Sequence, residues 1–185
     1  MDYKKIEALL NIYATNVIKE AKENLKSKKK SSSGKLYNSL SAKVTPLKDY
    51  ILLQFSMEDY GIFVDKGVKG KNPNALPKKA KWKGIQKAPN SPYQFGKGGT
   101  GLRAAINKWT VQKNVFNKQI RNKKGQFIPR KSLQFMMSRS IYLAGIEATQ
   151  FFSNPFNQGL KTLGDKLLKA FELDVEKNII LGDKK

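Results

Sequence analysis

The sequence predicts an α+β fold in which long helices pack on a small antiparallel β-sheet, with one long basic, loop-rich insertion. Three observations lead to this prediction. Apolar residues near both ends recur at spacings of three and four, as in amphipathic helices. Residues 42–57 are rich in strand formers on either side of a turn. The middle of the chain is rich in lysine, glycine and proline and has no such periodicity.

The length of 185 residues suits a single domain spanning residues 1–185. We expect residues 1–67 and 131–185 to form its core, with residues 68–130 as the basic insertion. Hydrophobic residues make up 39% of the chain and aromatic residues 10%, a composition that can form a buried core. Disordered tails lack such residues, so a folded protein is predicted.

The first predicted helix spans residues 2–28, with Asp2 expected as its N-cap. The polar run Lys28–Gly34 ends this helix and is expected to be a mobile connection. Ser33 is placed to cap a short second helix. The apolar face of the first helix consists of Tyr3, Ile6, Leu9, Leu10, Tyr13, Val17, Ile18, Ala21 and Leu25.

Two β-strands, at residues 42–47 and 50–57, follow, and Lys48-Asp49 is the natural turn of a hairpin. Pro46 predicts that the first strand is short or lies at an edge. The next segment, Tyr60–Gly67 (YGIFVDKG), is a compact apolar stretch bounded by glycines. Residues 68–100 are the least regular part of the chain.

Three more helices are predicted, at about residues 101–114, 131–148 and 156–179, from their apolar spacing. A basic turn around Gly125 separates the first two, and Pro155 breaks an apolar corner before the last. We expect twelve residues, each on the apolar face of its element, to be buried together. The predicted core is Leu9, Tyr13, Val17, Leu36, Phe55, Ile62, Phe63, Leu133, Ile141, Phe156, Leu163 and Leu167.

The positive charge is concentrated in the middle of the chain. The formal net charge is +22, from 36 basic and 14 acidic residues. From Lys66 to Ile146 there are 19 basic residues and no acidic one, whereas the rest of the chain carries 17 basic and 14 acidic residues. Such a field indicates a polyanion or acidic protein nearby, since solubility needs a net charge of only about 2–8. The alternative is a solvated basic surface.

The residues support no complete catalytic site. The chain contains no histidine and no cysteine, so the commonest general base and transition-metal ligands are missing. The glycine-rich segment 96–101 has the wrong order for a phosphate-binding loop. We therefore expect no enzymatic activity, no metal and no cofactor. The N-terminus has no signal-peptide pattern, and no apolar stretch approaches the ~20 residues of a membrane span, so no membrane partner is expected.

Two basic clusters are the candidate contact residues for a nucleic acid or an acidic partner. The first is Lys78, Lys79, Lys81 and Lys83 around Trp82, and the second is Arg121, Lys123 and Lys124 beside Phe127. Interleaved cations and aromatics can follow a phosphate backbone and stack on bases. Alternatively, Trp82 and Phe127 anchor loops to the protein's own core. Without a base-reading motif, sequence-specific recognition is not expected.

Three motifs, in order, resemble those of the tailed-bacteriophage neck and tail-completion family, which comprises minor tail and head–tail joining proteins. Ser33-Gly34-Lys35-Leu36 with Ser39 resembles its S-G-x-L-x-x-S element. Tyr60, Phe63, Val64 and Gly67 match its "YA-x-YVE-x-GT" segment, with Gly61, Asp65 and Val68 departing from it. Pro155 and Phe156 match its "PF-x-x-P-A" corner, although the second proline is absent. The resemblance covers roughly residues 1–67 and 131–180.

The resemblance implies a structural virion protein without enzymatic activity, a subunit of a 6- or 12-fold ring between the head portal and the tail. Its implied partners are further copies of itself, portal, adaptor or tail proteins and packaged DNA in the channel. It implies assembly in the host cytoplasm and a place in the virion neck or tail. The alternative is a nucleic-acid-binding accessory or packaging protein without sequence preference. An enzyme is the third hypothesis.

Overall fold

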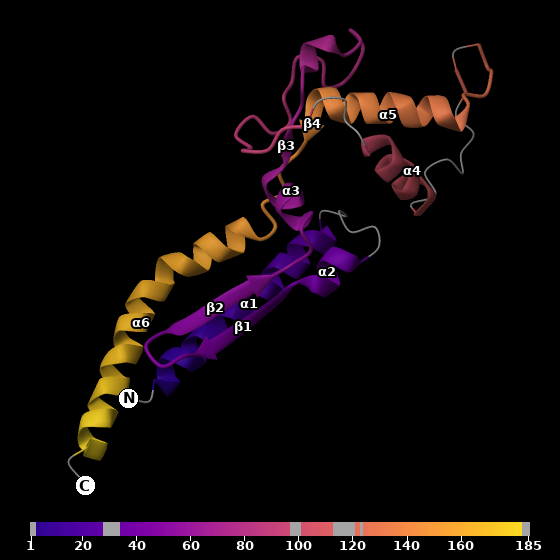
Figure 1. Cartoon of the computed structure of the whole chain (residues 1–185). Coiled ribbons are helices and arrows are strands. Elements are labelled where there is room, and N and C mark those ends of the chain that lie inside the picture. The colour runs from indigo at the N-terminus through magenta and orange to yellow at the C-terminus, as the bar shows by residue number, and fades with distance from the viewer. Residues whose placement is uncertain (1–2, 28–33, 97–100, 113–120, 123, 183–185) are drawn as a thin grey trace. The chain divides into compact units, whose positions relative to one another are not determined.

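The structure, a computed structural model, describes residues 3–27, 34–96, 101–112, 121–122 and 124–182, with side chains described as far as residue 177. Helices and small antiparallel sheets confirm the predicted α+β class (Figure 1). The chain forms two compact units, which we describe separately. Unit 1 comprises residues 1–59 and 151–185, and unit 2 comprises residues 60–150.

Unit 1 contains the elements predicted for the two ends of the chain. Helix α1 confirms the first predicted helix within the described residues, and the short helix α2 and the hairpin are also confirmed. The predicted caps Asp2 and Ser33 lie outside the described residues. The elements are α1 (Lys4–Ser27), α2 (Lys35–Ser39), β1 (Ser41–Pro46), β2 (Ile51–Ser56) and α6 (Ser153–Gly182).

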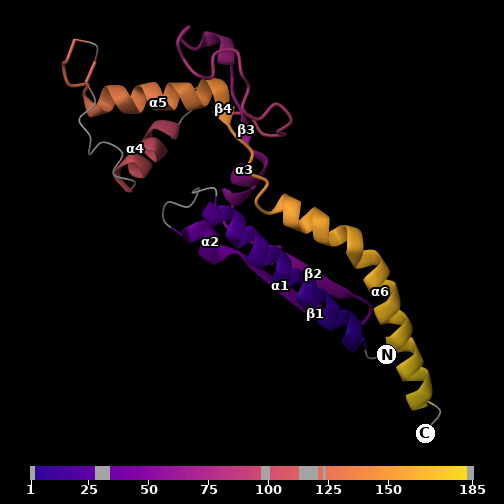
Figure 2. The ribbon, with the colours of Figure 1, turned by 180° about the vertical axis from the view of Figure 1, so that it is seen from behind.

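The hairpin presents one apolar face to helix α1. Strands β1 and β2 pair antiparallel from Ser41↔Ser56 to Pro46↔Ile51. Directly opposed residues share a face of the sheet, so Val44 and Leu53 point the same way. That face packs on the buried residues Leu10, Tyr13 and Val17 of α1 and Leu163 of α6. Figures 1 and 2 show α1 lying along the hairpin.

An aromatic cluster joins the three main elements of unit 1. Phe55 of β2 lies with its ring centroid 5.3 Å from that of Phe152 and 5.8 Å from that of Phe156. Tyr13 of α1 stands 6.2 Å from Phe156 and donates its hydroxyl to the Phe156 carbonyl at 2.9 Å. Burial raises the pKa of the Tyr13 phenol above its ordinary value of 10.0, because it disfavours the phenolate. The neutral donor form is therefore the one that the fold stabilises.

The N-terminus of α1 is capped by Asp174 of α6, 169 residues from Lys5 in sequence. One carboxylate oxygen of Asp174 accepts the Lys5 N–H at 3.0 Å and the Ile6 N–H at 3.1 Å. These are the second and third helical residues, the N–H groups that a cap normally satisfies. The carboxylate also opposes the positive end of the helix dipole. With an exposed fraction of 2%, Asp174 fixes how α6 lies on α1.

Replacing Asp174 should loosen unit 1. We expect Asp174→Ala to lower the free energy of unfolding by about 2 kcal/mol, because buried helix N–H groups lose charged acceptors. Asp174→Asn, which keeps an acceptor oxygen, should cost less. The exposed Asp165→Ala, on the same helix, is the control and should stay within about 0.5 kcal/mol. Denaturant unfolding measures all three, and equal effects at Asp174 and Asp165 would contradict the capping role.

Gly159 lets α6 approach α1 closely. A Cβ atom at this position would lie 2.6 Å from the Tyr13 ring, too close for an unshifted contact. The Tyr13 ring is held by its hydrogen bond and by the aromatic cluster, so it has little freedom to move away. Gly164, five residues further along α6, has no atom within 4 Å of such a Cβ.

These two glycines should respond in opposite ways to alanine. Gly159→Ala should destabilise the protein by about 1–2 kcal/mol, since overpacking costs about 1–3 kcal/mol and exceeds the gain in helix propensity. Gly164→Ala should stabilise it by up to about 1 kcal/mol through propensity alone. Thermal or denaturant unfolding of the two variants decides the matter. Stabilisation by both would show that Tyr13 yields at little cost.

One expectation for the C-terminal helix was wrong. Pro155 does not break the chain into a corner, because α6 already begins at Ser153 and Pro155 lies in its first turn. Proline is tolerated there, since its missing N–H would have no partner within the helix. The residues of this helix that the sequence placed in the core are buried or half-buried, although other apolar residues of the helix are exposed. Leu163 is buried and Leu167 half-buried, whereas Leu160, Leu168 and Phe171 are exposed.

Unit 2 contains the predicted basic insertion together with two segments that the sequence placed in the core. Residues 60–67 and the helix after residue 130 belong to this unit. The Val64 and Asp65 carbonyls accept the backbone N–H groups of Thr149 and Gln150, and the end of the helix pairs with the loop that precedes it. Of the predicted core, Ile62, Phe63, Leu133 and Ile141 therefore lie in unit 2. The elements are α3 (Gly61–Lys66), β3 (Val68–Lys69), the 3-10 helix η1 (Pro73–Ala75), α4 (Leu102–Gln112), α5 (Arg130–Ala144) and β4 (Gly145–Ile146).

The expected burial of Ile62 and Phe63 was wrong. Residues 61–66 form a short helix whose buried residues are Gly61 and Asp65, one turn apart. Ile62 and Phe63 consequently lie on the exposed side, where the Phe63 ring makes an edge contact with Tyr93 at 4.8 Å. The other predicted core residues are buried or half-buried within their own units.

Candidate polyanion-binding site

The loop that carries the first basic cluster is built on the C-terminal end of α5. The last four carbonyls of a helix have no partner within it. Here those of Tyr142, Leu143 and Ala144 accept the backbone N–H groups of Lys71, Asn72 and Lys87 at 2.8, 3.2 and 2.9 Å. The Ile141 carbonyl accepts the Gly145 N–H. All four carbonyls are thereby satisfied, and the irregular segment is fixed by backbone contacts rather than by a regular sheet.

Two glycines permit this close approach. Gly145 has φ 93°, a left-handed conformation, and a Cβ there would collide with the Val68 carbonyl. A Cβ at Gly70 would collide with the backbone at Leu143 and Ala144. The Gln86 side chain then pairs with both polar backbone groups of Gly70, accepting its N–H at 2.6 Å and donating to its carbonyl at 2.9 Å. The Gln86 side chain thus forms the two hydrogen bonds that the backbone of a neighbouring strand would otherwise form with Gly70.

The first cluster lies on this loop with its cations exposed. Lys78, Lys79, Lys81 and Lys83 are all exposed, and Lys83 donates to the Asn74 carbonyl. Trp82 is half-buried and packs against the buried residues Leu76, Leu143 and Ala144. Lys81 and Lys87 stand over its ring at 5.0 and 4.5 Å from the centroid. Of the two alternatives for Trp82, these contacts favour anchoring of the loop.

The second cluster lies on a turn that precedes α5. Arg121 and Phe127 form an isolated antiparallel bridge, and Gly125 at the turn has φ 77°. The Arg121 guanidinium lies 4.0 Å above the centre of the Phe127 ring, and one of its nitrogens donates to the Gly125 carbonyl at 2.9 Å. Lys124 is exposed, and Lys123 lies outside the described residues. Phe127 is 51% exposed, so this ring does not anchor the turn in a core.

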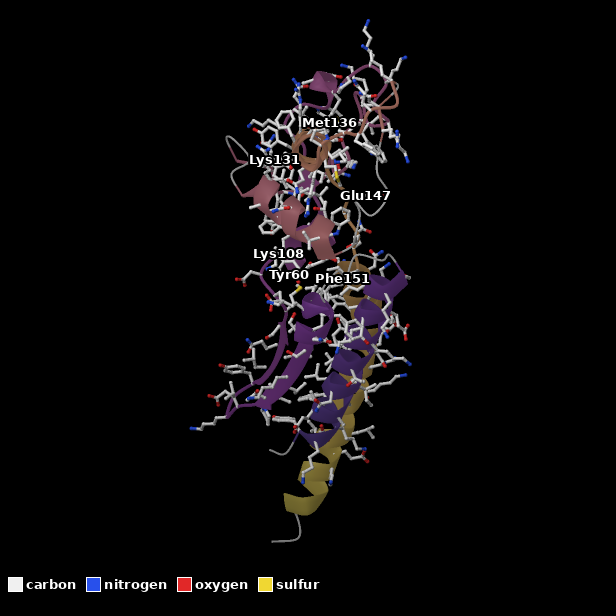
Figure 3. All side chains as sticks on the ribbon, turned by 90° about the vertical axis from the view of Figure 1, so that its right-hand side faces the viewer. Tyr60, Lys108, Lys131, Met136, Glu147 and Phe151 are labelled. Atoms are coloured by element: carbon white, nitrogen blue, oxygen red, sulfur yellow. The ribbon has the colours of Figure 1, made fainter. Side chains whose placement is uncertain are left out.

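The structure does not bring the two clusters together. One lies at the C-terminal end of α5 and the other just before its N-terminal end, as Figure 1 shows. A helix of 15 residues is about 22 Å long, so the clusters bracket a surface of roughly that length. Figure 3 shows nitrogen-tipped side chains gathered around this unit, including Lys108 and Lys131. The two clusters therefore do not form a single compact site.

The positive charge that the sequence places in the middle of the chain lies in unit 2. Residues 60–150 contain 19 basic and 2 acidic residues, a balance of +17. Residues 1–59 and 151–185 contain 17 basic and 12 acidic residues, a balance of +5. One of the two acids of unit 2, Asp65, is buried, with its carboxylate 3.9 Å from the Lys66 amine. Glu147 is exposed.

The residues matched to the family motifs serve different structural roles. Leu36 and Pro155 are buried, and Phe156 belongs to the aromatic cluster of unit 1. Gly34 adopts φ 72° at the start of α2, whereas Ser33 lies outside the described residues.

In unit 2, the Val64 carbonyl accepts the backbone N–H of Thr149 at 3.1 Å and its hydroxyl at 2.7 Å. Gly67 is buried at a backbone crossing, and its carbonyl accepts the Ser91 hydroxyl at 2.7 Å. Tyr60 and Phe63 are exposed. Within unit 2, Val64 and Gly67 therefore hold contacts between distant segments, whereas Tyr60 and Phe63 do not lie in a core.

Sequence reasoning missed the exposed face of α5. Lys131, Phe135 and Arg139 are all exposed and follow one another at intervals of four residues, which places them in one row. The four-residue spacing is visible in the sequence. Both basic clusters predicted from the sequence consist of cations close together along the chain, and the apolar residues of this segment predicted a buried helix.

The chain matches no family model, no curated protein and no solved structure. The described residues hold no group of three or more histidines, cysteines or carboxylates placed to bind a metal ion. Among the described helices, none combines the length and the apolar character that crossing a bilayer requires.

The two aromatic residues of the clusters should differ in their effect on stability. Trp82→Ala should lower the free energy of unfolding by about 1–3 kcal/mol, below the value for a fully buried tryptophan because Trp82 is only half-buried. Phe127→Ala should change it by no more than about 0.5 kcal/mol. Denaturant unfolding followed by circular dichroism makes the comparison. Unchanged stability with weakened nucleic-acid binding in Trp82→Ala would instead identify Trp82 as a contact residue.

Proposed function

We propose that the protein is a structural virion component, a subunit of a ring at the head–tail neck of a tailed bacteriophage, without catalytic activity. The order of the three sequence motifs suggests this family. The concentration of positive charge on unit 2 is the physical observation that supports the proposal. The ring would place unit 2 toward packaged DNA or acidic portal, adaptor or tail proteins. Assembly would occur in the host cytoplasm.

The charge segregation supports a conduit or partner of opposite sign. A balance of +17 on 91 residues repels itself, and a ring multiplies the repulsion because every subunit carries the same unit. Salt screens charges beyond about 8 Å but leaves neighbouring loops interacting. A polyanion in the middle of the ring would remove this cost. Contacts to phosphates carry no sequence information, as a channel that passes any sequence requires.

Unit 1 offers apolar surface for contacts between subunits. Ile12 of α1 and Leu160, Leu168 and Phe171 of α6 are exposed. Apolar surface of this kind is commonly covered in assemblies. In the proposed ring, these side chains are candidates for contacts between subunits, while unit 2 would face the polyanion.

A nucleic-acid-binding accessory or packaging protein is the second candidate, because the same charge would serve it. Measuring the particle mass across a salt series separates the two. A ring subunit stays assembled as rising salt removes nucleic acid, and negative-stain micrographs then show closed rings. An accessory binder becomes a monomer or small dimer under the same conditions.

The basic clusters should matter for assembly and not for folding. We expect a variant with Lys78, Lys79, Lys81, Lys83, Arg121, Lys123 and Lys124 all changed to Gln to fold with an equal or higher thermal midpoint, since repulsion is relieved. Particle assembly or DNA retention should fail. Calorimetry and complementation of a phage lacking the gene provide the measurements. Normal yields of infectious particles from this variant would show that the clusters are only a solvated surface with no role in assembly.

A further inference from the structure

The exposed face of α5 has a composition that is unusual for a solvated helix. Lys131, Phe135 and Arg139 form its row, Met136 lies beside Phe135, and Phe135 is 51% exposed. Solvated helices commonly pair Glu with Lys four residues apart. Helices α4 and α5 together contain five cations and no acidic residue, so no such pair exists within or between them.

Packing against α4 fixes which side of α5 faces outward. Leu133, Gln134 and Ser138 are buried, and Gln134 donates to the Asn107 side chain of α4 at 2.6 Å. Lys131, Phe135 and Arg139 are exposed and run beside Gln134 and Ser138 along the helix, with one helical turn between members. The cations at its ends are about 12 Å apart along the axis. The row is thus a fixed feature of a packed helix.

The charge at the N-terminal end of α5 is opposite to what a helix dipole favours. Arg130 and Lys131 occupy the first turn, and Arg121 and Lys124 lie on the turn before it. Cations are favourable at a helix C-terminus and unfavourable at an N-terminus. An anionic ligand at this end would be attracted by the dipole and by the side chains together.

We propose that the α5 row binds nucleic acid, with Lys131 and Arg139 on phosphates and Phe135 against a base or sugar between them. This inference rests on the proposed polyanion-facing role of unit 2. Nucleic acid is favoured over an acidic protein because 15 of the 19 cations in residues 66–146 are lysines, which protein interfaces exclude from their cores. A half-exposed aromatic ring between cations also matches the platforms that stack on bases.

The test is equilibrium binding of the full-length protein to a 20-nucleotide oligothymidine and to a 20-base-pair duplex across a salt series, by fluorescence anisotropy. For Lys131→Gln with Arg139→Gln, the slope of log affinity against log salt should become shallower by about 1.8 on duplex and about 1.4 on single strand. Phe135→Ala should leave the slope unchanged and weaken single-strand binding by about 5- to 140-fold. If Phe135→Ala weakens binding to the single strand alone, the ligand of the α5 row is an unpaired strand. If it weakens binding to both oligonucleotides, Phe135 contacts a groove of the duplex.

The control is Lys161→Gln with Lys169→Gln, which removes the same charge from exposed positions on α6 of unit 1. Slopes that fall equally in this control and in the α5 variant overturn the inference. A loss of binding to polyglutamate but not to nucleic acid also overturns it and identifies an acidic protein partner. If the protein forms rings that bind no nucleic acid, only the α5 inference is refuted. If it is a monomer that binds nucleic acid, only the proposed ring is refuted.

Discussion

The unpaired backbone groups at two helix ends determine which distant segments must lie together. In unit 1, the N–H groups of Lys5 and Ile6 are satisfied by Asp174, so the last helix must return along the first. In unit 2, the carbonyls of Tyr142, Leu143 and Ala144 are satisfied by backbone from the loop after β3. Polar groups that lose contact with water and have no partner are costly, so these contacts constrain the fold in addition to the apolar clusters.

Apolar spacing predicted the elements of this chain better than it predicted their packing. Helix α1 and the hairpin were predictable because each buries one regular face, and periodicity reports such faces directly. The cap from Asp174 was not, since nothing local connects residues 169 positions apart. The exposure of Ile62 and Phe63 was not predictable either, because a six-residue helix buries only one side and composition does not say which.

The candidate site, too, was only partly predictable from the sequence. The net charge of a segment is the sum of the charges of its residues. The excess of positive charge in the middle of the chain therefore follows from the sequence alone. The separation of the two clusters does not, because it depends on α5 lying between the loop and the turn. The contacts of Trp82 depend on tertiary packing with Leu76 and Leu143, so the sequence left open whether Trp82 anchors the loop or contacts a ligand.

The construction of unit 2 explains how it tolerates so much charge. Its loop is held by backbone hydrogen bonds and by a small cluster of Leu76, Leu143 and Ala144, and the exposed lysines of the first cluster contribute few contacts to it. We therefore expect the cations of the first cluster to be dispensable for folding, and their repulsion is a cost that a bound polyanion would reduce. A ligand that binds the folded surface alone also stabilises it by mass action. On the proposed function, binding would stabilise unit 2 for that reason, and the basic units would be more stable in a ring filled with nucleic acid than in an empty one.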